Sequence, residues 1–128
     1  MKLKLTTIYV DDQDTALRYY TDVLGLVPTG DFSNDGYRWL TVGSPDGDGL
    51  DLQLALNDDP AAKAYQAAMF EQGQPAVMFY TDDLNADFER IKAAGGVFTT
   101  EPTDVTASSI ATLNDTCGNL VQITQLKD

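Results

Sequence analysis

The stretch IYVDD at Ile8–Asp12 returns in the second half of the chain as FYTDD at Phe79–Asp83. Each copy ends an apolar run, and apolar residues at helical spacing follow, at 17, 20 and 24 in the first half and at 84, 88 and 91 in the second. An aspartate in this place can accept hydrogen bonds from the free N–H groups of a helix start. We therefore predict that the chain forms the same strand-to-helix junction twice.

The repeat extends beyond this junction. Gly25 and the pair Gly95-Gly96 stand where a helix would end in a left-handed residue. Asp59-Pro60 can start a further helix, and Gly73 can end it. The first strand is predicted within residues 1–10, and turn-rich sequences separate the other predicted strands, which cover 27–32, 37–42, 50–56, 97–100, 109–113 and 120–126.

This order predicts an α+β fold of two tandem βαβββ modules, 1–57 and 75–128, joined by a helical linker, 58–74, in a single domain, 1–128. One helix covers one face of a sheet, so we expect the uncovered faces of the two sheets to enclose a shared cavity. The alternating run LDLQLAL predicts that Leu50, Leu52, Leu54 and Leu56 face the helix. Asp51, Gln53 and, in the last strand, Gln122 then face the cavity.

The composition limits the classes of partner. Twenty acidic residues stand against eight basic ones, and the net charge is −12. Such a surface repels nucleic acid and anionic membranes and attracts cationic small molecules, although the acid can also serve solubility alone. No apolar run approaches the roughly 20 residues that cross a bilayer. The N-terminus is too short and polar for a signal peptide, and Cys117 has no second cysteine to pair with, so we predict a cytoplasmic protein.

The run YVDDQDTALRYYTDVLGL resembles the opening of the vicinal oxygen chelate superfamily, which includes glyoxalase I, extradiol dioxygenases, and fosfomycin- and bleomycin-resistance proteins. FYTDDLNADFERIKAAGG and NDTCGNLVQI resemble its second half, so the resemblance covers essentially the whole chain. It implies the two-module fold. It does not imply one activity, because this superfamily supports many chemistries and several binding proteins.

Metalloenzymes of this superfamily hold a divalent ion with His and Glu at four equivalent strand positions. By resemblance these positions are Leu5, Gln53, Ala76 and Gln122, and none of them supplies an imidazole or a carboxylate. The chain contains no histidine at all. A shift of one residue around Gln53 would bring Asp51 into the set. We predict no metal and no cofactor.

Three other residues have chemistry that a site could use, each with an ordinary alternative. Asp51 is the acid placed on the cavity face, or a solvated residue at its rim. Cys117 is a nucleophile without a histidine to activate it, or a turn cysteine. Arg38 holds an anionic ligand, or pairs with one of the many aspartates. We predict no catalytic residue.

The aromatic residues give the candidate binding site. Aromatic side chains stack on flat organic ligands while amides orient them, although the same residues can fill a cavity as core. The predicted ligand-binding residues are Tyr9, Tyr37, Trp39, Gln53, Met78, Tyr80 and Gln122.

The resemblance to the bleomycin-resistance type implies a homodimer that binds a small organic molecule without metal, possible ligands being a drug or an aromatic or cationic metabolite. The alternative is a lyase, isomerase or dioxygenase-like enzyme with an atypical or absent metal site. A third interpretation is a structural or regulatory subunit whose cavity is filled.

Overall fold

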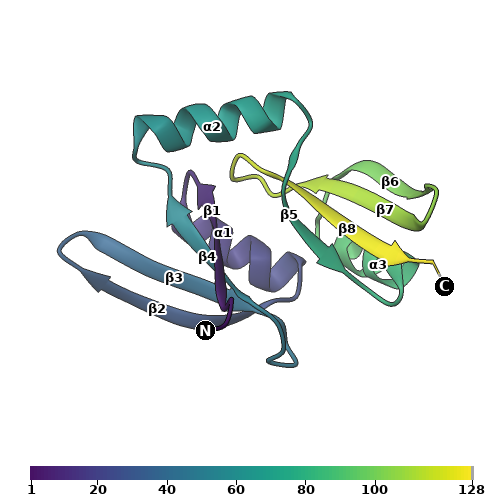
Figure 1. The fold of residues 1–128 in the computed structure, drawn as a ribbon, viewed down its shortest axis with the longest axis horizontal. Coiled ribbons are helices and arrows are strands. Elements are labelled where there is room, and N and C mark those ends of the chain that lie inside the picture. Colours follow the sequence, from purple (N-terminus) through teal and green to yellow (C-terminus); the bar gives the residue numbers. More distant parts are fainter. Residues whose placement is uncertain (128) are drawn as a thin grey trace.

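The computed structural model describes residues 1–127 and repeats one order of elements twice (Figure 1). The first module contains β1 (Leu5–Val10), α1 (Gln13–Arg18), a π-helical turn η1 (Tyr19–Val23), β2 (Val27–Asn34), β3 (Tyr37–Gly43) and β4 (Asp51–Leu56). Helix α2 (Pro60–Glu71) follows. The second module contains β5 (Pro75–Tyr80), α3 (Leu84–Ala93), β6 (Phe98–Asp104), β7 (Ser108–Asn114) and β8 (Leu120–Leu126).

The two sheets have the same topology. The strand orders are β1-β4-β3-β2 and β5-β8-β7-β6. The first strand of each module is parallel to the last one, and the remaining pairs are antiparallel. In Figure 1 the sheets lie side by side, and α2 runs above the gap between them. The prediction of an α+β fold with two tandem βαβββ modules is confirmed, while the exact module limits stay a prediction.

The repeated aspartates begin the helices as expected. Asp12 accepts a hydrogen bond from the Thr15 backbone N–H at 2.9 Å, and Asp83 accepts one from the Ala86 N–H at 3.0 Å. These side chains satisfy N–H groups that have no partner within the helix. The capping prediction is therefore confirmed for both copies of the junction.

Replacing Asp12 by alanine is expected to lower the melting temperature by about 4 °C, because one helix cap is lost. The hydrogen bond from Thr15 lowers the pKa of Asp12 below its usual value of 3.8. A carboxylate whose pKa is lowered on folding stabilises the fold fully above its ordinary pKa. This stabilisation is lost as the pH falls through the lowered pKa. Thermal melts at pH 7 and at a series of pH values below 3.8 should therefore show a difference between wild type and variant that is full at pH 7 and shrinks as the pH falls. Asp82→Ala, one residue before the second cap, is the matched control and should leave the melting temperature unchanged.

The leucine face of β4 is only partly as predicted. Leu52 and Leu54 are buried, but Leu50 and Leu56 are 39% and 42% exposed. Leu50 precedes β4, and Leu56 is its last residue and pairs with Val10 at the end of β1, so both leucines lie at the ends of the strand. The helical prediction also missed the π turn. Its wider hydrogen bond, from the Leu24 N–H to the Tyr19 carbonyl at 3.0 Å, accompanies burial of two consecutive tyrosines.

The strand predictions needed one larger correction. The strand expected at 97–100 runs over Phe98–Asp104 as β6. Its pairing with β7 shifts register twice, between Phe98 and Thr100 and between Thr100 and Thr103. Pro102 lies in this irregular stretch, and a proline cannot donate to a ladder.

One hydrophobic core joins the modules. It combines buried side chains of the first module, such as Tyr20 and Leu54, with Leu113 and Val121 of the second. Polar contacts also cross between the modules, because the Tyr20 hydroxyl donates to Asp115 at 2.6 Å. Within residues 1–127, no helix is long and apolar enough to cross a membrane.

Candidate functional site

A pocket of about 370 Å³ lies on the first sheet, at the end of β4. Three of the predicted ligand-binding residues, Tyr9, Tyr37 and Gln53, line it together. Tyr9 comes from β1, Gln53 from β4 and Tyr37 from the start of β3. Its other lining residues are Thr7, Gln13, Gly36, Arg38, Ala55, Leu56, Asp58 and Asp59. Its volume falls in the range of small-molecule pockets.

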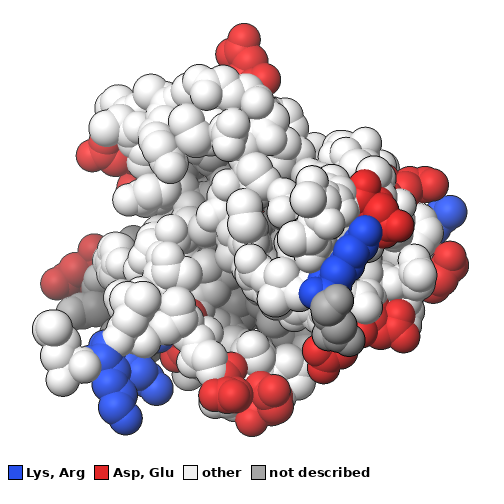
Figure 2. Space-filling model, turned by 45° about the vertical axis from the view of Figure 1, so that its right-hand side comes forward, with Lys and Arg blue, Asp and Glu red and all other residues white. Residues whose placement is uncertain are grey.

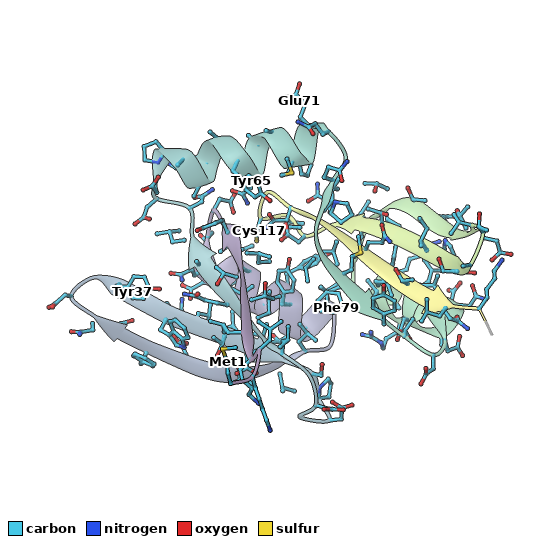
Figure 3. All side chains as sticks on the ribbon, viewed as in Figure 1. Met1, Tyr37, Tyr65, Glu71, Phe79 and Cys117 are labelled. Carbon is cyan, nitrogen blue, oxygen red and sulfur yellow. The ribbon has the colours of Figure 1, made fainter. Side chains whose placement is uncertain are left out.

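The pocket exists because β3 and β4 separate. Their ladder pairs only Thr41 with Gln53 and Val42 with Leu52 within the described chain. Next to these two pairs, the Gln13 side-chain amide donates to the Leu54 carbonyl at 2.9 Å and to the Arg38 carbonyl at 3.2 Å. Gln13 thus satisfies backbone groups of both strands that no longer bond to each other. In Figure 3, Tyr37 lies beside the β2–β3 hairpin, on the far side of the first sheet from Phe79.

A chain of hydrogen bonds crosses the pocket floor. The Thr7 hydroxyl donates to Gln53 Oε1 at 2.9 Å, and Gln53 Nε2 donates to the Tyr37 hydroxyl oxygen at 2.9 Å. Gln53 is only 7% exposed, so these bonds satisfy a buried amide. They also fix the direction in which the amide points.

The charged residues at the pocket leave it acidic. Arg38 is paired with Asp14 at 2.6 Å and Asp31 at 2.9 Å, and these carboxylates raise its pKa further. The interpretation of Arg38 as a partner of surface aspartates is confirmed. Asp59 accepts from the Ala61 N–H and caps α2. Asp58, in contrast, has no hydrogen bond or ion pair to any residue of 1–127. Its carboxylate is therefore free to face a cation.

The other predicted ligand-binding residues lie elsewhere. Trp39 is on the same sheet but stacks on Phe32, with ring centroids 6.4 Å apart, and does not line this pocket. Met78 and Tyr80 are exposed on β5 of the second sheet. Gln122, on β8, donates to the Thr124 hydroxyl at 3.2 Å. The seven predicted residues are thus divided between two sheets, and a contact of Met78, Tyr80 and Gln122 with the same ligand stays a prediction.

The residues at the expected metal positions do not fit a divalent ion. The side chains of Leu5 and Ala76 have no ligating atom, and the side-chain oxygen of Gln53 already accepts from Thr7. Within residues 1–127, no group of three His, Cys, Asp or Glu side chains is arranged to hold a metal. Asp51, the alternative ligand or base, does not line the pocket. Metal independence stays a prediction that the donor set supports.

Cys117 lacks the properties of a nucleophile. It is fully buried in the loop between β7 and β8, near the centre of the molecule (Figure 3). Burial, and secondarily the nearby Asp115, raise the pKa of its thiol to about 12. A thiol that stays protonated is unreactive at neutral pH.

Among the pocket residues that the sequence interpretation missed, three are important for the site: Thr7, Gln13 and Asp58. Thr7 could have been found, because it alternates with Tyr9 on one strand face and lies opposite Gln53 in the register. Asp58 lies next to the helix cap Asp59, and no sequence pattern marks it as a binding residue. Gln13 follows the cap Asp12, and no sequence pattern shows that two strands separate next to it.

The comparison with known families is consistent with this geometry. The model of the Glyoxalase/Bleomycin resistance protein/Dioxygenase superfamily matches residues 2–123. The chain belongs to this superfamily. Its predicted membership, stated above under the name vicinal oxygen chelate, is therefore confirmed.

Relatives and solved structures extend this comparison. The chain is 47% identical over 126 residues to the uncharacterized protein YurT of Bacillus subtilis, covering 98% of this chain and 99% of that protein. It is 29% identical to a probable lactoylglutathione lyase of Vibrio cholerae, covering 95% and 88%. The structure of TnmS3, an antibiotic binding protein from Streptomyces sp. CB03234, matches with a TM-score of 0.80 at 23% identity, covering 99% and 97%. At that identity, the last match supports the fold alone.

Proposed function

We propose that this superfamily member binds a small organic molecule at the β3–β4 pocket, without a metal ion and without changing it chemically. The observation that carries the proposal is the meeting of Tyr9, Tyr37 and Gln53 in one pocket. Two aromatic rings beside an oriented amide suit a flat organic ligand. TnmS3, which has the same fold, is described as an antibiotic binding protein, so this fold can serve binding.

The proposed ligand carries a positive charge. Asp58 and Asp59 line the pocket, and the nearby Arg38 is already paired with two aspartates. A cation entering the pocket would meet carboxylates rather than a free guanidinium. The net charge of −12 would also attract such a ligand over a longer range at low salt.

We further propose a cytoplasmic homodimer in which a second copy covers the open sheet faces. Large apolar side chains are exposed there, including Met78 at 52% and Tyr80 at 65%. In the face seen in Figure 2, charged residues, most of them acidic, lie around the edge, while the hollowed centre shows no charged side chain. Extended apolar surface of this kind is typical of interfaces. A partner sheet could then bring Met78, Tyr80 and Gln122 to the ligand.

Native mass spectrometry and a ligand titration test this proposal together. We expect a dimer without a stoichiometric metal ion. We also expect 1-methylquinolinium, a flat aromatic cation, to bind saturably in isothermal titration calorimetry. A dimer that carries one divalent ion per subunit, or a chain that binds no aromatic cation, would contradict the proposal.

Replacing Asp58 by asparagine is expected to raise the Kd for 1-methylquinolinium about two- to fivefold, because an exposed charge pair is lost. The effect should shrink from 20 mM to 500 mM salt, since screening weakens the attraction in the wild type. Asp82→Asn removes the same charge away from the pocket and is the control. Equal effects of the two substitutions would mean that only net charge matters, and Asp58 would then have no place in the site.

The alternative is a lyase, isomerase or dioxygenase-like enzyme. The observation that favours it is the 29% identity to the probable lactoylglutathione lyase of Vibrio cholerae. Such an enzyme would need an atypical metal site or none, because the four expected ligand positions hold no carboxylate or imidazole. Isomerisation of the methylglyoxal–glutathione hemithioacetal, measured with added Zn²⁺, Ni²⁺ or Mn²⁺, would establish this alternative and reject pure binding.

A further inference from the structure

The hydrogen bonds at the pocket floor all run in one direction. The Thr7 hydroxyl has a single hydrogen, and it is donated to Gln53 Oε1. The oxygen end of the amide therefore faces β1, and the NH₂ end faces the Tyr37 hydroxyl, to which it donates at 2.9 Å. An amide nitrogen cannot accept a hydrogen bond. Tyr37 is thus an acceptor toward Gln53, and its own hydrogen must point elsewhere.

That hydrogen has no partner in the described chain. Within residues 1–127, the bond from Gln53 is the only one made by the Tyr37 hydroxyl. Tyr37 is 55% exposed and lines the pocket, so its hydrogen is available to a ligand. Bonds that run head to tail also polarise one another, which strengthens the donor at the end of the chain.

Most of the other side-chain donors of the pocket are held by protein acceptors. Gln13 donates both amide hydrogens to backbone carbonyls, and Arg38 uses three of its five N–H groups on the carboxylates of Asp14 and Asp31, which neutralise the guanidinium. Tyr9 also has a hydroxyl, but nothing in the described residues fixes whether it donates or accepts. Tyr37 is therefore the pocket hydroxyl whose free hydrogen has a fixed direction.

We propose that Tyr37 is a specificity-determining residue, and that Thr7 and Gln53 position it as a hydrogen-bond donor. The pocket then selects aromatic cations that carry an acceptor oxygen, such as a carbonyl group, next to the ring. This inference rests on the proposed function, because it names the ligand class of the same pocket.

Two probes that differ only in an acceptor test the inference. These are 1-methylquinolinium and 3-acetyl-1-methylquinolinium, and the readout is the ratio of their Kd values. We expect the wild type to bind the acetyl compound about five- to tenfold more tightly, as one net hydrogen bond implies. Tyr37→Phe keeps the ring and should reduce the ratio to about one. Tyr65→Phe, on α2 outside this pocket, should keep the wild-type ratio.

Substitutions of Thr7 test its positioning role separately. Thr7→Val removes the first donor, so that the Gln53 amide can turn and accept the Tyr37 hydrogen. The preference for the acetyl probe should then fall to about one, although neither Tyr37 nor Gln53 has changed. Thr7→Ser restores the hydroxyl and should restore the preference. A merely structural Thr7 would change the affinity for both probes equally.

The outcomes separate this inference from the proposed function. If the wild type binds both probes with equal affinity, or if Tyr37→Phe keeps the preference, the inference is overturned while the binding function stands. If Thr7→Val keeps the preference, the positioning role is overturned. If the wild type binds neither probe, the proposed function fails and this inference fails with it.

Discussion

Asp115→Ala is expected to lower the free energy of unfolding by about 4 kcal/mol. The Asp115 carboxylate is fully buried and accepts four hydrogen bonds. The donors are the Tyr20 hydroxyl, the Cys117 and Asn119 N–H groups and the Asn119 side-chain amide. Without the carboxylate, buried donors lose their partner, and each unsatisfied group costs about 1–3 kcal/mol. Urea unfolding followed by circular dichroism measures the loss.

Tyr20→Phe is the comparison that isolates one of these bonds. It removes the 2.6 Å bond to Asp115 but leaves the other three donors in place. We expect a loss of about 1–2 kcal/mol, well below that of Asp115→Ala. If the two variants unfold at the same urea concentration, the loop bonds to Asp115 contribute nothing, and the account of this network is wrong.

Local features of the fold could be predicted because their causes are local. The caps Asp12 and Asp83 act on N–H groups three residues away, so the repeated aspartate was sufficient evidence. The burial of Leu52 and Leu54 follows from alternation along one strand. The exposure of Leu56 could not be predicted, because it depends on how the start of helix α1 lies over the end of β4.

Part of the candidate site could also be predicted, because the alternation of side chains along a strand is a local feature. Tyr9 and Gln53 were found by strand parity, and they do lie together. Trp39 has the correct parity too, but Phe32 on the neighbouring strand occupies one face of its ring. The position of the pocket depends on the separation of β3 from β4, which no sequence pattern indicates. The bond between Tyr20 and Asp115 joins residues far apart in the chain, so its partners could not be paired from sequence.

Helix α2 contacts both modules through the side chain of Gln66. The Gln66 amide donates to the Tyr9 carbonyl at 2.8 Å and to the Cys117 carbonyl at 2.9 Å. Its oxygen accepts from the Asn57 side chain at 2.7 Å. Gly118 packs directly against this amide. A Cβ atom on Gly118 would lie 2.5 Å from Gln66 Nε2 and 2.9 Å from its Cδ.

Gly118→Ala is therefore expected to destabilise the fold by about 3–4 kcal/mol. Part of this is backbone strain, since the φ angle of Gly118 is +100° and side chains rarely tolerate such angles. The rest comes from Gln66, which must leave its carbonyl acceptors to avoid the new methyl group. Gly95→Ala is the matched control. Its φ angle is +104°, but a Cβ there meets no described atom within 4 Å, so only the strain of about 1–2 kcal/mol remains.

A double-mutant cycle separates the two causes. Gln66→Ala removes the colliding side chain, so adding Gly118→Ala to it should cost only the backbone strain, about 1–2 kcal/mol. The two substitutions should thus be less than additive, by about 2 kcal/mol, in urea unfolding. Strict additivity would show that the alanine methyl group does not displace Gln66, and the effect of Gly118 would then lie entirely in its backbone. Non-additivity would establish that part of the cost of Gly118→Ala comes from displacing the Gln66 amide, which bonds to the carbonyls of Tyr9 and Cys117.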